Sequence, residues 1–150
     1  MYILKIFKFI IHNISCKCQW DFYGHSFSDK SKKVLETVHP YLQLICYEAI
    51  KIIDFTPLEG LRNEEKQNNY FHAGKSKLKY PQSRHNKSIL LKLDKFSDAI
   101  DLVPYPIDWD NKERFQHLSG IIKGIALSKG IQIEWGGDWN KKDLPHFQFK

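Results

Sequence analysis

SRHNKSILLKLDKFSDAID, residues 83–101, is the stretch around which the rest of the chain is organised. It contains His85 near its start and closes on Asp101, inside the apolar run 99–103. A carboxylate within a buried strand is unfavourable unless it is paired or binds a metal. Imidazole and carboxylate groups are common zinc ligands. These residues therefore indicate a zinc site, with His146 in DLPHF as the candidate third ligand.

A catalytic zinc site needs three protein ligands, an open position for water and a general base within reach of that water. Asp143 lies three residues before His146, and on an extended or turning segment this spacing can direct both side chains into one cleft. Asp143 is therefore the candidate base. Scattered ligands are a weak signal on their own. We interpret His117, on the predicted long helix, and His72, in the predicted third helix, as surface or boundary residues.

The composition is that of one globular domain: 150 residues, 42% hydrophobic, with a formal net charge of +6. Such a charge favours anionic partners, which include nucleic acid, anionic lipid and an anionic cell wall. The lysines are scattered and do not alternate with aromatic residues, so we expect a solvated basic surface and no nucleic-acid partner. We also expect a monomer. The three cysteines lack a regular spacing and are interpreted as free thiols: Cys16, Cys18 and Cys46.

The first 22 residues form an N-terminal appendage to a domain at residues 23–150. Residues 2–14 are apolar but interrupted by Lys5 and Lys8, and the uninterrupted piece is shorter than the roughly 20 residues that a bilayer requires. We therefore expect no stable transmembrane anchor. No small-residue cleavage site follows, which disfavours a standard signal peptide. An extra strand and a membrane-surface segment both fit this sequence.

The first half of the chain predicts three helices. Ser28 is a good N-cap for the first, which ends where Pro40 interrupts it. The second begins after Pro40. Its predicted apolar face is Leu42, Ile45, Ala49 and Ile52. The third follows a short extended segment at residues 54–58, is capped by Asn63 and ends at Gly74.

The second half predicts one long helix and several short strands. Asp110 and Glu113 form a capping-box pattern at the start of the helix, and Gly130 closes it. Its predicted apolar face is Phe115, Leu118, Ile122 and Ile125. The predicted strands cover residues 99–103, 131–135 and 145–149. The fold class is therefore α+β, with a small, mostly antiparallel sheet packed with helices and the zinc site in a cleft on the sheet.

Three further residues could border that cleft. Arg62 lies just before the cap of the third helix, where a side chain can project from a strand end, although the residues alone favour an ordinary surface arginine. Trp135 and Trp139 flank a Gly-Gly turn and would either line a peptide-binding cleft or pack in the core.

Six motifs occur in a characteristic order: VHPYL, EGLR followed by Gln67, SRH, DAIDLVPYPIDW, WGGDW and DLPHF. Together they cover about residues 26–149 and resemble the D-alanyl-D-alanine carboxypeptidase superfamily of zinc peptidases, which cut bacterial cell-wall peptides. The greatest likeness is to phage endolysins and bacterial enzymes that are L-alanyl-D-glutamate endopeptidases. The resemblance implies a zinc-dependent enzyme that hydrolyses stem-peptide bonds in bacterial peptidoglycan.

The resemblance also implies roles for particular residues. The implied zinc ligands are His85, Asp101 and His146. Asp143 matches the catalytic acid or base of the family. Arg62 falls where the family places an arginine that binds substrate and stabilises the developing oxyanion. Ser83 matches a serine that hydrogen-bonds the substrate backbone.

Two departures from the family signature, S-x-H-x-x-G-x-A-x-D, lie within residues 83–101. The signature separates histidine and aspartate by seven residues, whereas His85 and Asp101 are sixteen apart, which we interpret as an insertion containing ILLKLDK. Ser97 stands where the signature has glycine. If that position needs a positive φ angle, Ser97 would be modestly strained.

Two alternatives remain open at this point. A carboxypeptidase or dipeptidase that trims D-alanyl-D-alanine would use the same chemistry on a different length of substrate. A non-catalytic cell-wall-binding relative would keep the fold alone. The long insertion favours the second alternative, whereas the retained Asp143 argues against it.

Overall fold

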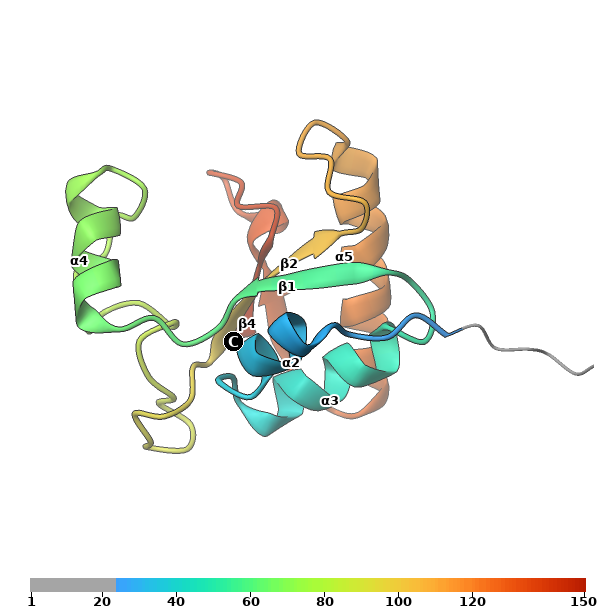
Figure 1. Ribbon diagram of the computed structural model, residues 1–150, viewed down its shortest axis with the longest axis horizontal. Helices are drawn as coiled ribbons and strands as arrows, with labels where there is room; N and C mark the ends of the chain where they lie inside the picture. The colour runs from blue at the N-terminus through green and yellow to red at the C-terminus, as the bar shows by residue number, and fades with distance from the viewer. Residues whose placement is uncertain (1–23) are drawn as a thin grey trace, which may run out of the picture.

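The computed structural model describes residues 24–150 (Figure 1). The helices are α2 (Asp29–Leu35), α3 (Pro40–Ala49), α4 (Glu64–His72) and α5 (Lys112–Ser128). The strands are β1 (Phe55–Glu59), β2 (Ala99–Pro104), β3 (Ile133–Trp135) and β4 (His146–Phe149), with a 3-10 turn, η1 (Gly136–Asp138), between β3 and β4. The predicted α+β class is confirmed. The predicted appendage, with Cys16 and Cys18, lies outside the described residues.

The four strands form one antiparallel sheet in the order β1-β2-β4-β3. Asp101 on β2 pairs with Glu59 on one side and with His146 on the other. Because directly paired residues project from the same face of a sheet, these three side chains form a polar row across it. The alternating residues Ile100 and Phe147 point to the other face and are buried.

The apolar face of the sheet is covered by α5, which packs on β2 and β3 and also contacts α3. Leu42, Ile45, Leu118 and Ile122 come from these two helices and belong to one buried cluster. Helix α4 stands apart from this layered body, at the left of Figure 1. Within residues 24–150, no helix is both long and apolar enough to cross a membrane.

Two of the predicted helix starts are confirmed, and one is wrong by a single residue. The side chains of Ser28 and Asn63 accept hydrogen bonds from backbone N–H groups of α2 and α4. Helix α5 is capped by Asn111, whose Oδ1 accepts from the backbone N–H of Arg114 at 3.3 Å. Asp110 instead donates its own N–H to a side chain in the preceding loop. Asparagine caps helices as well as aspartate does, so the sequence pattern does not separate neighbouring positions.

The predicted apolar face of α3 also needs correction at its end. The helix stops at Ala49, and the backbone N–H of Ile50 bonds to the carbonyl of Cys46. Past this point the helical progression no longer applies, and Ile52 is 63% exposed, while Ile50 is buried. Cys46 is a buried free thiol.

The inserted residues lie in a loop that projects away from the sheet, in yellow near the bottom of Figure 1. A fully buried carboxylate, that of Asp98, closes the base of this loop. Its Oδ1 accepts from the Ser88 hydroxyl at 2.6 Å, and its Oδ2 accepts from the N–H groups of Ile89 at 2.7 Å and Leu90 at 3.2 Å. Ser97 does not have a positive φ, so the strain considered for it does not arise.

Replacing Asp98 with alanine is expected to destabilise the protein by about 3 kcal/mol, because one buried and two partly buried donors lose a charged acceptor. Urea unfolding followed by circular dichroism measures this difference. Asp94→Ala, at an exposed position of the same loop, is the matched control and should change the free energy of unfolding by less than about 0.5 kcal/mol. A similar small change for Asp98→Ala would contradict the anchoring role.

Candidate active site

Three side chains from separate segments meet above the polar face of the sheet. Asp101 Oδ1 lies 3.3 Å from His85 Nε2 and 3.1 Å from His146 Nδ1, and the two ring nitrogens are 3.2 Å apart. Asp101 and His146 come from paired strands, and His85 comes from the turn before the insertion. The insertion therefore does not separate the residues that the sequence analysis brought together.

Hydrogen bonds on the far side of each imidazole determine which nitrogen carries the proton. His85 Nδ1 lies 2.7 Å from the carbonyl oxygen of Gly60 and must donate to it. His146 Nε2 lies 2.9 Å from Gln148 Oε1. The amide of Gln148 is oriented by donating its Nε2–H to Glu134, so His146 Nε2 also acts as donor. In the neutral rings, His85 Nε2 and His146 Nδ1 therefore both present lone pairs to one point.

This donor set fits a metal ion. Two nitrogen lone pairs and a carboxylate oxygen that face one another repel unless a proton or a cation lies between them. Zinc–ligand distances of about 2.0–2.1 Å in a tetrahedron place neighbouring ligand atoms about 3.3 Å apart, close to the spacing described above. Within residues 24–150, His85, Asp101 and His146 form a group that could hold a metal ion, since one ligand atom from each lies within 4.8 Å of the other two.

Without a metal, the charges in this cluster depend strongly on one another. Burial alone would raise the pKa of Asp101, but the charges and hydrogen bonds of His85 and His146 outweigh burial and hold that pKa well below its usual range. Burial alone would lower the pKa of His146, but its hydrogen bond to Asp101 and the charge of that carboxylate raise it. In the metal-free protein, the negative charge of Asp101 therefore favours the protonated form of His146.

We expect the metal-free protein to be most stable between about pH 4 and pH 6.5. The raised pKa of His146 stabilises the fold below 6.5, the ordinary imidazole value, and this contribution is lost as the pH rises through the folded pKa. The lowered pKa of Asp101 stabilises the fold above 3.8 and is lost only in stronger acid. Thermal unfolding in a chelator tests this; a melting temperature that rises steadily above about pH 7 would contradict it.

Arg62 is only 7% exposed, so the surface position that the residues alone favoured is wrong. Its Nη2 donates to Glu59 Oε2 at 2.8 Å, and its Nη1 donates to Gln67 Oε1 at 2.9 Å. Its guanidinium carbon lies 4.7 Å from the centre of the Tyr70 ring, and its Nη2 is 3.9 Å from Asp101 Oδ2. The structure therefore fixes this cation beside the histidine–aspartate cluster, as the family resemblance implied.

Ser83 lies at the same side of the cluster and is buried. Its hydroxyl accepts the backbone N–H of His85 at 3.3 Å. Asn86 holds this turn in place, since its Oδ1 accepts from the N–H of Ser83 and its Nδ2 donates to the carbonyl oxygen of Arg62 at 2.9 Å. The motif SRH therefore extends functionally to the asparagine after it, which the sequence analysis missed.

Asp143 and His146 share one turn, in which the N–H of His146 donates to the carbonyl oxygen of Asp143 at 3.2 Å. The carbonyl of Gly136 accepts the N–H of Asp143 at 2.9 Å. A side chain at position 136 would overlap Asp143, which explains the first glycine of WGGDW. Burial raises the pKa of Asp143, and the nearby charge of Asp101 raises it further, against the opposing effect of neighbouring cations.

The two tryptophans have different positions. The Trp139 ring lies 5.1 Å from the ring of His146 and borders the cleft. Trp135 is 5% exposed, stacks on Phe147 and donates its Nε1–H to the carbonyl oxygen of Leu144. Trp135 therefore packs in the core and does not line the cleft; of the two roles considered for it, the peptide-binding one is wrong.

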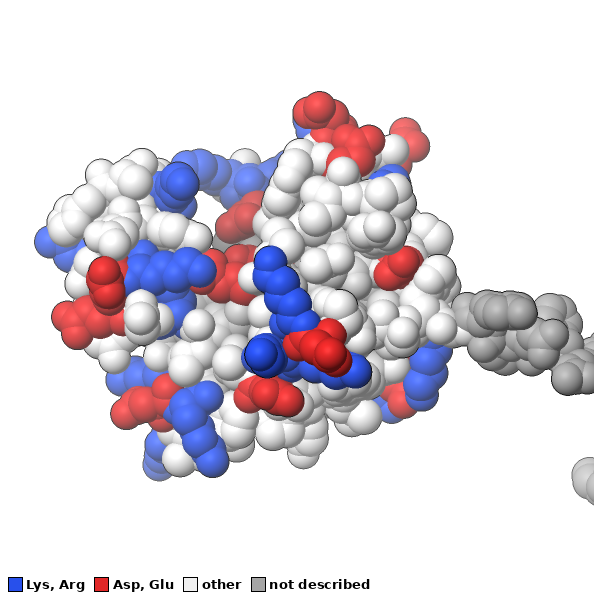
Figure 2. Space-filling model, viewed as in Figure 1, with Lys and Arg blue, Asp and Glu red and all other residues white. Residues whose placement is uncertain are grey.

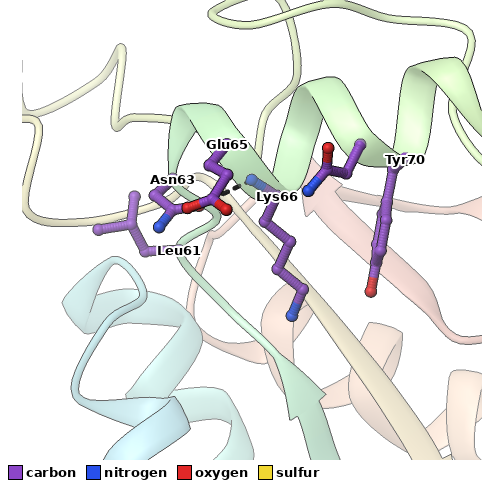
Figure 3. A pocket seen from close by; sticks show the side chains of 6 residues that line it. Leu61, Asn63, Glu65, Lys66 and Tyr70 are labelled. Atoms are coloured by element: carbon purple, nitrogen blue, oxygen red, sulfur yellow. Dashed lines mark hydrogen bonds between the residues drawn. The ribbon is translucent and has the colours of Figure 1, made fainter.

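The predicted site residues other than Trp135 line a cleft of about 890 Å³ between α4 and the sheet: Arg62, Ser83, His85, Asp101, Trp139, Asp143 and His146. Figure 2 shows a hollow there, with Lys and Arg side chains on its rim and Asp and Glu side chains inside it. Glu59, Gln148 and Trp109 also line it and were not expected from the sequence. A smaller depression of about 410 Å³ lies along α4, where Lys66 and Tyr70 extend side by side (Figure 3). Both residues also border the main cleft.

The model of the phage L-alanyl-D-glutamate peptidase family matches residues 23–147. The chain belongs to this family. The match spans every element described above except the last residues of β4, and it confirms the resemblance inferred from the six motifs. No curated protein matches the chain.

Among solved structures, this member of the phage L-alanyl-D-glutamate peptidase family is similar to the Serratia marcescens L-Ala D-Glu endopeptidase ChiX. The two are 29% identical in sequence and superpose with a TM-score of 0.70. The similarity covers 87% of this chain and 93% of that one. The shared architecture therefore includes the whole cleft-bearing domain.

Proposed function

We propose that this chain is a zinc-dependent, endolysin-like peptidase that hydrolyses the L-alanyl-D-glutamate bond of bacterial peptidoglycan stem peptides. The observation that carries the proposal is the convergence of His85 Nε2, Asp101 Oδ1 and His146 Nδ1 in a cleft that also holds Asp143. Family membership supports the bond and the substrate. The donor set, with two nitrogens and one oxygen, supports zinc.

His85, Asp101 and His146 would hold the metal, leaving a fourth position open to the cleft. Zinc bound there supplies Lewis-acid polarisation of the scissile carbonyl and a lowered pKa for its water. Gly60 and Gln148 orient the two imidazoles through the hydrogen bonds on their far sides. Such outer partners typically raise metal affinity about 10- to 100-fold.

Asp143 is the proposed general base and acid. It takes a proton from the attacking water and later delivers it to the leaving amine. Because its pKa is raised, the carboxyl group is closer to the operating pH and exchanges a proton more readily than an ordinary aspartate. Its backbone bond to Gly136 fixes the segment that carries it.

Arg62 is the proposed oxyanion-binding residue, with Glu59 and Gln67 holding its guanidinium in place. Removing one such donor typically raises the activation free energy of the reaction by about 3 kcal/mol. Ser83 is the proposed contact to the substrate backbone, and Trp139 borders the peptide-binding cleft.

Digestion of purified peptidoglycan, with and without a chelator, tests this proposal. Cleavage should release a new N-terminal D-glutamate, identified by fragment mass, and should stop when zinc is removed and resume when it is restored. Release of free D-alanine would instead identify the carboxypeptidase alternative. Binding to the wall without any new fragment would identify the non-catalytic alternative, and full activity of the metal-free protein would exclude the zinc mechanism.

We further propose that residues 23–150 form the peptidase domain, acting as a monomer, with residues 1–22 as an appendage. The start of the family match at residue 23 supports this boundary. A protein lacking residues 1–22 should keep its rate on soluble peptides and elute as a monomer in size-exclusion chromatography. A loss of zinc binding on truncation would show that the boundary is wrong.

A further inference from the structure

The cleft contains more positive charge than its own carboxylates balance. Arg62 and Lys66 are both paired with Glu59. Five other cations line the same cleft: Lys75, Lys77, Arg84, Lys141 and Lys142. None of these five forms an ion pair with any residue between 24 and 150. We call them the cationic lining.

The cationic lining accounts for much of the surplus charge of a chain whose formal net charge is +6. Like charges gathered around one concave surface raise its potential and attract anions into it. In Figure 2 basic side chains border the hollow, and others lie elsewhere on this face of the molecule. The arrangement therefore favours a negatively charged ligand within the cleft itself.

Arg84 is the member of the lining with the most specific chemistry. It directly precedes His85, and its backbone carbonyl accepts the N–H of Asp98 at 3.0 Å. Its side chain is half-buried and makes no hydrogen bond or ion pair with the described residues. A guanidinium removed from water without an acceptor is unfavourable. Its planar fork matches a carboxylate through two parallel hydrogen bonds. Lys142, another member of the lining, directly precedes Asp143 and donates to the carbonyl oxygen of Gly137 at 3.1 Å.

The substrate class supplies a matching anion. D-glutamate has two carboxyl groups, and a peptide chain continues through at most one of them. The residue that follows the scissile bond therefore carries either a free carboxylate or, where that group is modified, a neutral amide. This group lies only a few bonds from the leaving nitrogen, and so close to the residues flanking His85 and Asp143.

We propose that the cationic lining, with Arg84 as its carboxylate-binding residue, selects substrates whose D-glutamate carboxylate is free over substrates in which it is amidated. The inference rests on the proposed function, because it assigns the residue after the scissile bond to this side of the cleft. Acid and amide have nearly the same size, so the discrimination arises from charge and not from shape.

The test uses two synthetic stem peptides that differ only in this group, one with the free carboxylate and one with the amide. The zinc-loaded full-length protein should cleave the acid with a kcat/KM at least about tenfold higher than the amide. Added salt should reduce the preference, since part of it comes from exposed lysines. Arg84→Gln should lower the rate on the acid about tenfold more than the rate on the amide, and Arg84→Lys should restore part of the difference.

Lys33→Gln removes one positive charge outside the cleft and is the matched control; it should keep the wild-type preference. Equal cleavage of acid and amide by the wild type would overturn the proposal. So would an Arg84→Gln variant that loses the same factor on both peptides, because that result indicates a general structural role.

Direct binding separates this inference from the proposed function. Calorimetry with the zinc-loaded Asp143→Asn variant measures the affinity for each peptide without turnover. If this variant binds the acid more tightly, the role of the cationic lining is supported. If the wild type then cleaves neither peptide, the proposed function is wrong but the role of the lining still holds. Equal affinities overturn the lining's role even if cleavage of the L-alanyl-D-glutamate bond is observed.

Discussion

Asp143→Asn is expected to lower kcat/KM for stem-peptide cleavage by about a hundred- to ten-thousand-fold while leaving zinc bound. Asparagine has nearly the same shape as aspartate but cannot accept the proton of the attacking water. The backbone contacts of this residue, to Gly136 and His146, do not involve the carboxyl group and should persist. The fold and the metal site should therefore remain while the proton transfer is lost.

Three measurements make this expectation specific: peptide cleavage rate, zinc content of the purified protein and thermal unfolding. Asp138→Asn is the matched control, since Asp138 lies in the same connection but pairs with Lys123 outside the cleft. The control should keep most of the activity. A variant Asp143→Asn with a wild-type rate would remove Asp143 from the mechanism, and one that loses zinc would show instead that it binds the metal.

Asp101→Asn should abolish both metal binding and activity. Asp101 supplies the single anionic group of the cluster, close to two histidine nitrogens and Arg62. The neutral amide of an asparagine at this position would be a much weaker metal ligand than the carboxylate. A ligand that binds only the folded state stabilises it by about 4 kcal/mol at a thousandfold excess over its Kd. Saturating zinc should therefore raise the melting temperature of the wild type on the order of 10 °C, and that of the variant hardly at all.

Calorimetric unfolding with and without zinc measures this shift, and a colorimetric zinc assay measures occupancy. Asp110→Asn, an exposed aspartate before α5, is the control and should retain the full zinc-dependent shift. If Asp101→Asn still gained the wild-type shift, zinc would be binding elsewhere, and the His85–Asp101–His146 cluster would be no metal site.

The His85–Asp101–His146 cluster could be found in the sequence because its chemistry is unusual in its local setting. A carboxylate at Asp101 inside an apolar strand needs an explanation, and histidines in SRH and DLPHF provide one. Supporting residues such as Glu59 and Gln148 give no such signal. Glu59 is an ordinary polar residue until the strand register places it opposite Asp101. Gln148 lies two residues after His146 on β4, and its role depends on the hydrogen bond between their side chains.

The burial of Trp135 has a signal in the sequence. Ile131, Ile133 and Trp135 alternate, and residues two apart in a strand share a face. That alternation already groups Trp135 with the isoleucines that face the core, whereas Trp139 lies beyond the turn. Local ambiguity of another kind affects Asn111 and Asp110, which are neighbouring residues with equal capping ability. Only the hydrogen bond to Arg114 decides between them.

The structure of the insertion could not be read from its composition. ILLKLDK resembles a piece of core, yet Leu90 and Leu93 are exposed, and the residue that organises the loop is the carboxylate of Asp98 that follows it. Its partners are mostly backbone N–H groups, which every sequence offers. A contact of this kind becomes visible only in three dimensions.

Because Asp98 anchors the base of the loop, we expect the exposed tip to tolerate changes that leave His85 and Asp101, on either side of the loop, in place. The loop is therefore a site at which the domain could accept added peptide sequence. It lies a few residues from the cleft, and Asp98 anchors it independently of the cleft. Segments that recognise a particular wall polymer could be exchanged between Leu91 and Lys92 to redirect the lysin to other bacteria, with its cutting chemistry left intact.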